Sequence, residues 1–349
     1  MKRVLLGAVS RAGSFYDSFW ECFRIKTGYL TKCVRSFIII VTKCFVAHES
    51  FVKDVEPNQS RKERKMMENA MQGIIDMHIH AAPDVRARKL DDLELMEASV
   101  QRGVRAIVLK SHNVPTADRA YLVNRVAKEK YPEANFTAFG GLCLNRPVGG
   151  LNPDAVETSL KLGAKVIWLP TNTAENHLRK NGKDPSKGVK VLENDKVVDA
   201  LQDVFALVKQ YNAVLATGHI GAEECFPVVE AARAAGVEKI VITHPEFWVV
   251  GMTQAQQAEI VKKYDVLLES VYAQPVNGGY KINIPDNIAA MQAIGPEHFV
   301  LSTDSGQTVN PYWYESYTTY FNAVSEVFPP EQVRKMTHDN PAWLLDIDQ

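Results

Sequence analysis

Asp76, His78 and His80 alternate along a short stretch that follows the apolar run Gly73-Ile74-Ile75. Alternate side chains of a β-strand lie on one face, so we expect these three side chains to point the same way. Two neutral imidazoles two residues apart on one face can share a divalent metal ion. An isolated His-x-His also occurs on surface strands. The pair therefore predicts a metal site only if other strands bring further ligands to the same point.

Eight apolar runs of strand length follow one another through the chain, with helical segments between them. The runs are Ile74–His80, Ala106–His112, Phe136–Leu144, Lys165–Pro170, Val214–Ile220, Lys239–His244, Val266–Val271 and Phe299–Asp304. The helical segments are Leu90–Arg102, Thr116–Tyr131, Pro153–Leu162, Val197–Tyr211, Ala222–Ala235, Gln254–Tyr264 and Asp286–Ile294. This alternation predicts an α/β fold with a parallel sheet and right-handed crossovers. Eight such units predict a (β/α)₈ TIM barrel. A doubly wound open sheet is the alternative, but the first run is not followed by a glycine-rich phosphate loop.

Polar residues that can bind a metal gather where the predicted strands end. They are His78, His80, Lys110, His112, His219, His244 and Asp304. The carboxyl ends of the strands carry the active site in barrels of this kind. Any one of these residues alone could be a capping or buried hydrogen-bonded group. Their convergence from several strands predicts a metal site.

The whole pattern resembles the amidohydrolase superfamily of metal-dependent hydrolases, and within it an uncharacterised amidohydrolase-like group that begins Asp-x-His-x-His-Ala-Ala-Pro-Asp. The resemblance runs from about Gly73 to the C-terminus. It includes His338–Leu345, which is similar to the Asn-Pro-Ala helix that closes many such barrels. In that superfamily His-x-His lies on strand one, single histidines lie on strands five and six, and an aspartate lies on strand eight. The resemblance therefore implies a divalent metal, most simply Zn²⁺, held by His78, His80, His219, His244 and Asp304.

One position departs from the superfamily pattern. Members with two metals often bridge them with a carboxylated lysine or a glutamate at the end of strand four, where this chain has Trp168-Leu169-Pro170. The lysine at a strand end is Lys110, on strand two. It is a candidate carbamate ligand, a candidate cation for a substrate anion, or a lysine paired with a carboxylate. We therefore expect one metal, and a second only through Lys110.

The residue types also suggest roles in catalysis. A bound Zn²⁺ lowers the pKa of water towards about 7 and polarises a scissile carbonyl or phosphoryl group. Asp304 is expected to accept the proton of the attacking water, or else to serve only as a ligand or strand cap. His244 is either a further ligand or a hydrogen-bond donor to the substrate. Asp76 is expected to orient a histidine or the end of the strand.

Substrate contacts are expected from residues of the strand ends and the loops beyond them. The candidates are Arg86, His112, Arg146, His177 and Arg179. Arginine forks suit carboxylates and phosphates, which favours a small anionic substrate, although solvated surface arginines would look the same. The long segment after strand four contains a predicted hairpin, Gly188–Val198. That segment is either a lid or a contact in a homo-oligomer.

The leading functional hypothesis is a metal-dependent hydrolase of an amide, lactam, lactone or ester. A metal-dependent decarboxylase with the same barrel is the first alternative, and a phosphoesterase is the second. A catalytically silent barrel that binds a ligand or a partner and uses its metal structurally belongs to a different class.

Composition narrows the setting. The 349 residues are 46% hydrophobic, with 40 Lys+Arg against 41 Asp+Glu, so no basic surface for nucleic acid is expected. The five cysteines form no CxxC pair, which favours a reducing cytoplasm. Residues 1–65 differ in composition and contain no segment long enough to cross a membrane. They are interpreted as a poorly ordered leader, a signal or transit segment, or an extension upstream of a true start at Met66 or Met67. The barrel domain is expected to span residues 66–349.

Overall fold

The computed structural model describes residues 70–347. The chain divides into two units, Met1–Arg64 and Lys65–Gln349, and the fold described below belongs to the second. The interpretations of residues 1–65 and of a start at Met66 or Met67 concern positions outside the described residues. Within residues 70–347, no helix is both long enough and apolar enough to span a bilayer.

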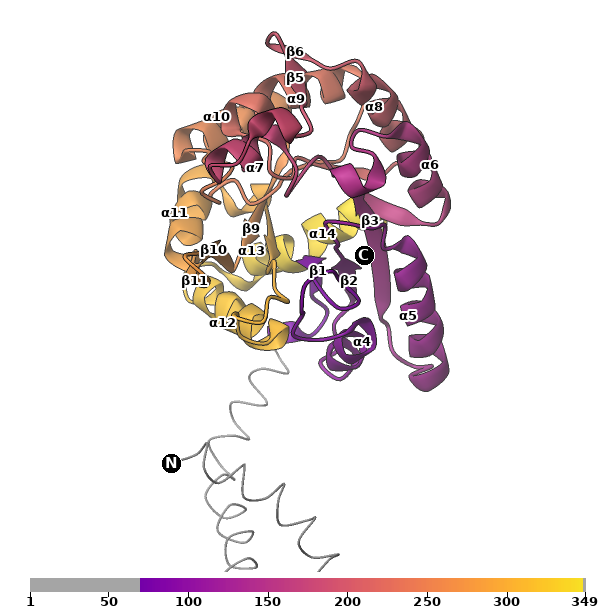
Figure 1. The fold of residues 1–349 in the computed structure, drawn as a ribbon. Helices are drawn as coiled ribbons and strands as arrows, with labels where there is room; N and C mark the ends of the chain where they lie inside the picture. The colour runs from indigo at the N-terminus through magenta and orange to yellow at the C-terminus, as the bar shows by residue number, and fades with distance from the viewer. Residues whose placement is uncertain (1–69, 348–349) are drawn as a thin grey trace, which may run out of the picture. The chain divides into compact units, whose positions relative to one another are not determined.

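Eight parallel strands form the central sheet, in chain order around its circumference (Figure 1). They are β1 (Ile75–Ile79), β2 (Ala106–Leu109), β3 (Thr137–Cys143), β4 (Ala164–Trp168), β7 (Val214–Ala216), β8 (Ile240–Ile242), β9 (Leu267–Val271) and β12 (Phe299–Ser302). The last strand returns to the first, because His80 N donates to Ser305 O (2.8 Å) and Asp304 N donates to His78 O (2.9 Å). The predicted (β/α)₈ barrel is confirmed.

Helices follow the strands and surround the sheet (Figure 1). They are α4 (Asp92–Val100), α5 (Ala117–Lys130), α6 (Pro153–Lys161), α8 (Ala200–Gln210), α9 (Ala222–Ala234), α10 (Gln254–Tyr264), α11 (Ile284–Ile294) and α12 (Trp313–Ser325). All seven predicted helical segments are confirmed. Their starts follow local chemistry. Asp91, for example, accepts from Leu93 N and Glu94 N, while Glu94 accepts from Asp91 N in return.

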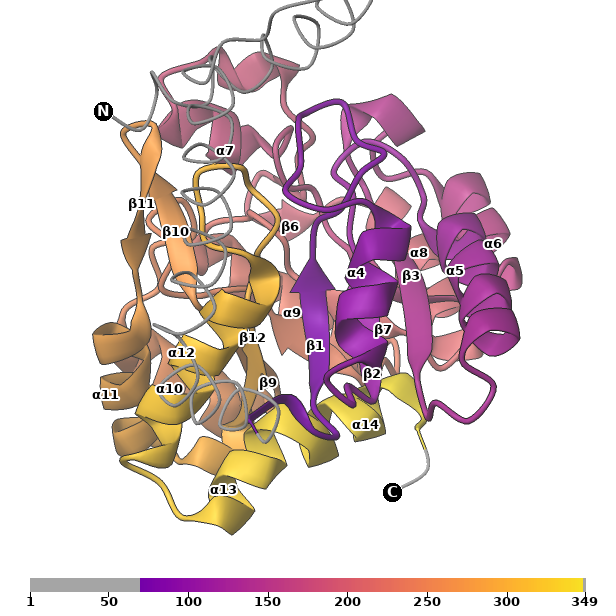
Figure 2. The same cartoon turned by 90° about the horizontal axis from the view of Figure 1, so that it is seen from below.

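Two apolar clusters hold the barrel together. The larger lies between the strands and the surrounding helices. The smaller joins inward-facing strand residues such as Val108 and Val300 to Leu344 and Leu345 of α14 (Asn340–Leu345). Figure 2 shows α14 across the amino ends of the strands, as expected from the Asn-Pro-Ala motif. The chemistry is thereby left to the carboxyl ends.

Strand β1 contains an irregularity that was not expected from the sequence. Asp76 pairs with Ile107 and Ile79 pairs with Leu109, so β1 has one residue more than β2 over this interval. This β-bulge changes the face on which the following side chains lie. Asp76 therefore points away from His78 and His80. The prediction that all three side chains share a face is wrong.

The remaining elements lie in the connections. They are η1 (Arg146–Val148), α7 (Glu175–Lys180), η2 (Pro185–Lys187), β5 (Leu192–Glu193), β6 (Lys196–Val197), β10 (Ala273–Val276), β11 (Gly279–Ile282), η3 (Pro296–His298), α13 (Pro330–Arg334) and the π-helix η4 (Lys335–Asp339). The antiparallel pair β5–β6 confirms the predicted hairpin. The hairpin β10–β11 was not expected. Figure 2 shows α7 and β10–β11 beyond the carboxyl ends of the strands.

Candidate metal centre

Three side chains converge where β1 meets the end of β12. His78, His80 and Asp304 each place a ligand atom within 4.8 Å of the other two. Asp304 Oδ1 lies 3.1 Å from His78 Nε2 and 3.2 Å from His80 Nε2. Both histidines are almost fully buried. Two imidazoles and a carboxylate are a donor set that suits Zn²⁺ and similar divalent ions.

His219 and His244 lie beside this cluster, but they are not among its three converging residues. Their ring centroids are 5.1 Å apart, and the ring of His244 lies 5.8 Å from that of His78. The five residues expected to bind metal are therefore close neighbours. The three whose ligand atoms lie closest together, His78, His80 and Asp304, come from the ends of β1 and β12 alone.

Buried ring nitrogens beside the cluster test whether the residues fit a metal ion. Among the described residues, both ring nitrogens of His244 are buried without a hydrogen-bond partner. Such atoms are rare, because an unsatisfied buried polar group costs free energy. A divalent cation would bind the lone pair of one of these nitrogens, and the other nitrogen would keep its proton. The residues present therefore fit a metal ion.

His78 is fixed by partners on both sides of its ring. Glu269 Oε2, on β9, lies 3.0 Å from Nδ1, and Lys110 Nζ lies 2.8 Å from Nε2. A carboxylate on Nδ1 keeps the proton there and leaves the Nε2 lone pair for a metal. Lys110 Nζ lies next to the same nitrogen, with its ammonium 5.0 Å from the centroid of the Trp168 ring.

The charges of the cluster are strongly coupled. Burial alone would raise the pKa of Asp304, but His78 and His80 hold it well below its usual range. Burial would likewise lower the pKa of His78, yet Asp304 and Glu269 raise it to about 9. Without a metal, a proton on His78 therefore balances the two carboxylates.

His80 has a different environment. Arg88 Nη2 lies 3.3 Å from His80 Nδ1 and 2.7 Å from Asp84 Oδ2. Burial and the Arg88 charge lower the pKa of His80 to about 3. Since Arg88 can only donate, a metal on His80 Nε2 requires Arg88 to release Nδ1 so that this nitrogen can hold the proton.

Unusual backbone turns bring the ligands inward. His244 and Asp304 follow their strands with positive φ angles of 27° and 50°. Backbone strain of this kind is found at sites where the surroundings impose it. Gly218 precedes His219 with φ of +64°, and a Cβ there would lie 2.4 Å from Leu169 O, so only glycine fits.

Asp304 connects the cluster to a cleft of about 430 Å³, which it lines. Its lining includes Arg86, Arg88, His112, His177, Lys183, His219, Phe247, Trp248 and Asp304, together with residues 275–279 of the β10–β11 hairpin. Among the described residues that line it, Asp304 is the one carboxylate and three are permanent cations. The lining thus combines three cations with two aromatic side chains, Phe247 and Trp248.

The predicted substrate residues divide into two groups. Arg86, His112 and His177 line the cleft, whereas Arg146 and Arg179 are exposed and do not line it. Arg179 Nη2 instead lies 3.4 Å from Asn176 Oδ1. Arg146 follows β3 but turns outward in η1.

Three contributors, Glu269, Phe247 and Trp248, were not assigned a role from the sequence. Glu269 lies in the middle of an apolar strand rather than at its end. A lone acidic residue in such a buried run is the signal that could have identified it. Phe247 and Trp248 had no comparable pattern. Trp248 Nε1 donates to Pro275 O (3.1 Å), which attaches this ring to the β10–β11 hairpin.

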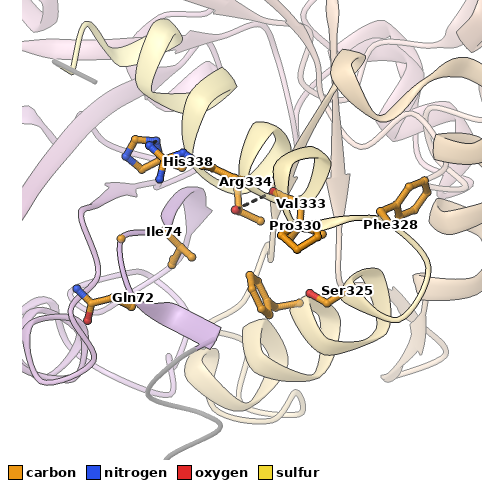
Figure 3. Close-up of a pocket in the computed structure, with 11 residues that line it drawn as sticks. Gln72, Ile74, Ser325, Phe328, Pro330, Val333, Arg334 and His338 are labelled. Atoms are coloured by element: carbon orange, nitrogen blue, oxygen red, sulfur yellow. Dashed lines mark hydrogen bonds between the residues drawn. The ribbon is translucent and has the colours of Figure 1, made fainter.

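A second pocket, of about 370 Å³, lies before β1 at the opposite end of the barrel (Figure 3). Ile74, Phe328, Pro330 and Val333 form much of its lining. Its His338 is bonded to Asp339 (3.0 Å). Among the described residues it holds no set of converging metal ligands.

Solved structures share this fold. An amidohydrolase from Pseudomonas aeruginosa matches with a TM-score of 0.57 and 12% identity, covering 81% of this chain and 97% of that one. A dipeptidase AC, a metallo peptidase, matches with a TM-score of 0.53 and 10% identity, covering 79% of this chain and 98% of that one. A dihydroorotase matches with a TM-score of 0.50 and 15% identity, covering 79% of this chain and 70% of that one. The resemblance to the amidohydrolase superfamily is confirmed at the level of the fold.

A family model covers more than half of the chain, from residue 73 to residue 269. The chain belongs to that family, which is described as a family of unknown function (DUF6282). A search of curated protein sequences found no significant match.

Proposed function

We propose that this protein is a metal-dependent hydrolase that cleaves an amide, lactam, lactone or ester in a small anionic substrate. The observation that carries the proposal is the convergence of His78, His80 and Asp304, of which Asp304 lines a cleft, beside buried nitrogens that lack partners. A divalent ion held there supplies a Lewis acid and lowers the pKa of water towards neutrality.

The residues of the chain divide the remaining work. Asp304 stays ionised at neutral pH because His78 and His80 lower its pKa, so it can accept the proton of the attacking water. The same carboxyl then delivers that proton to the leaving group. His244 is neutral, because burial lowers its pKa to about 3. It donates a hydrogen bond to the substrate oxygen from one ring nitrogen, or binds the ion.

The cleft charges support an anionic substrate. Arg88 is paired with Asp84 (2.7 Å), whereas Arg86 and Lys183 line the cleft and have no ion pair among the described residues. A carboxylate or phosphate on the substrate would meet these two cations. Lys110 is a further cation, but it lies deep in the barrel, 1% exposed.

Product analysis in H₂¹⁸O tests the proposal. The protein is loaded with Zn²⁺ or Mn²⁺ and screened against carboxylate-bearing amides, lactams, lactones and esters. Hydrolysis incorporates one ¹⁸O per turnover, and Asp304→Asn should lower kcat by about 10²–10⁴-fold. Asp195→Asn, in the exposed β5–β6 turn, is the matched control.

Two results would contradict the proposal. Release of CO₂ without addition of water would assign the site to decarboxylation. Full activity of Asp304→Asn would remove the proposed base.

A further inference from the structure

A second histidine faces the ring of His219. His177 Nδ1 lies 2.9 Å from His219 Nδ1, and the two rings are stacked with centroids 4.9 Å apart and planes 19° apart. His177 belongs to α7, in the segment that follows β4. Thus β4, which ends without a metal ligand, is followed by a segment that reaches a candidate ligand on the next strand.

The short contact between like atoms restricts where protons can be. Two facing nitrogens 2.9 Å apart form a hydrogen bond only if one has a proton and the other has a lone pair. If the proton is on His219 Nδ1, then Nε2 of His219 is free to bind a metal. If the proton is on His177 Nδ1, then Nδ1 of His219 is the acceptor. Nε2 of a neutral His219 then holds the proton of that ring and cannot bind a metal ion.

We infer that His177 is a positioning residue, which accepts the Nδ1 proton of His219 and so keeps His219 Nε2 available for a divalent metal. This inference rests on the proposed metal-dependent function. Histidines that bind metals generally donate their other N–H to a partner that fixes the tautomer and the ring orientation. Glu269 makes that contact for His78, and His177 makes it for His219.

The backbone around His177 is held in place for this task. The neighbouring residue, Asn176, is 3% exposed, and its Nδ2 donates both to His219 O (3.0 Å) and to Val249 O (2.9 Å). The start of α7 is therefore attached to the main chain of the residue whose ring it contacts. Figure 2 shows α7 beyond the carboxyl ends of the strands. The segment after β4 is accordingly part of the metal centre.

Metal binding by four proteins tests the inference: wild type, His219→Ala, His177→Leu and His177→Asn. Leucine removes the acceptor, whereas the Oδ1 of asparagine replaces it close to the position of Nδ1. Titration of each metal-free protein with Zn²⁺ gives Kd, and the visible absorption of bound Co²⁺ reports its ligand geometry.

We expect His177→Leu to weaken Zn²⁺ binding by about 10- to 100-fold and to shift the Co²⁺ spectrum as His219→Ala does. His177→Asn should stay within a few-fold of wild type. His298→Leu, which changes a histidine in η3, is the matched control for loss of an imidazole.

Each outcome has a separate meaning. If wild type binds neither ion, the proposed function fails. If wild type binds and His219→Ala or His177→Leu leaves Kd and spectrum unchanged, the inference is overturned while the function stands. Should His177→Leu not fold, ¹⁵N shifts of the His219 ring in Zn²⁺-loaded wild type decide: a proton on Nδ1 is expected, and a proton on Nε2 would overturn the inference.

Discussion

His78 lies between Asp304 and Glu269, and Lys110 contacts the same ring. Each carboxylate favours a positive charge near His78, either a proton or a metal ion. Glu269 contacts Nδ1, so it can keep its hydrogen bond in both states. Asp304 and Lys110 lie near Nε2 and must rearrange when an ion binds there. Glu269 is therefore the fixed partner of this ligand.

Replacement of Glu269 by glutamine should weaken metal binding by about 10- to 100-fold, because the amide no longer holds the Nδ1 proton of His78 with a full negative charge. Titration with Zn²⁺ measures the change. Glu193→Gln, in the exposed β5–β6 hairpin, should bind as wild type does. Equal affinities for Glu269→Gln and wild type would show that Glu269 does not support the metal centre.

Metal uptake should release protons. Because the pKa of His78 is raised to about 9 in the metal-free protein, the ring carries a proton at pH 7 that a bound ion displaces. We expect the apparent affinity for Zn²⁺ to increase with pH and to level off near pH 9. Titrations in buffers of different ionisation enthalpy measure the protons released. An affinity independent of pH between 6 and 8 would contradict this account.

Residue types and spacing were enough to predict that His78, His80 and Asp304 lie together. The supporting residues were harder to predict, because their role depends on which neighbour they contact. Glu269 is adjacent to His78 only after β9 and β1 have taken their places in the barrel. The same holds for His177, because its contact with His219 depends on how the long segment after β4 folds.

At the scale of elements, β1 shows how one extra residue changes a site. The bulge between Asp76 and Ile79 separates Asp76 from the two histidines. Asp76 then joins three elements, because its carboxylate accepts from His78 N (3.1 Å), Thr303 Oγ1 (2.7 Å) and Trp313 Nε1 (2.9 Å). Asp76 thus orients the end of the strand, which is one of the two roles expected for it from the sequence.

Replacement of Asp76 by asparagine should destabilise the fold by about 1–3 kcal/mol, because an amide N–H replaces an acceptor that faces buried donors. Urea unfolding measures the free energy. Asp154→Asn, near the exposed start of α6, should change it little. A loss below about 0.5 kcal/mol for Asp76→Asn would show that this carboxylate does not hold β1 to β12 and α12.

Strands and helices of the barrel were predictable because their hydrophobic periodicity is strong and repeats eight times. The bulge in β1 and the hairpin β10–β11 were not. A bulge depends on the register with β2, which a single strand does not specify. The hairpin has an Asn277-Gly278 turn, but its Val276, Tyr280 and Ile282 are partly exposed, so it lacks an alternating buried face.

For the molecule as a whole, the interior contains several neutral histidines. Burial, as the largest cause, lowers the pKa of His80 to about 3, of His177 to about 4 and of His244 to about 3. An unfolded histidine titrates near 6.5. Between these values the unfolded chain binds protons that the folded protein does not. The stability that these residues contribute is therefore present above pH 6.5 and lost as pH falls towards 4.

The metal-free protein should accordingly lose on the order of 2–4 kcal/mol of unfolding free energy between pH 6 and pH 5, since each proton taken up contributes about 1.4 kcal/mol per pH unit. His78 acts in the opposite direction above pH 6.5, because its pKa is raised. Urea unfolding across this range measures the slope. His244→Phe should lower the slope by about one proton, and an unchanged slope would refute the neutral state of His244.

The metal content of the purified protein tests the central claim most directly. Elemental analysis after removal of loosely bound ions should find one divalent ion per chain in wild type and a large loss in His78→Ala. His298→Ala should retain the ion. Zinc at 100 times its Kd should also stabilise wild type by about 2.7 kcal/mol. If wild type holds no ion, and added Zn²⁺ or Mn²⁺ neither binds nor stabilises it, the cluster of His78, His80 and Asp304 is not a metal centre.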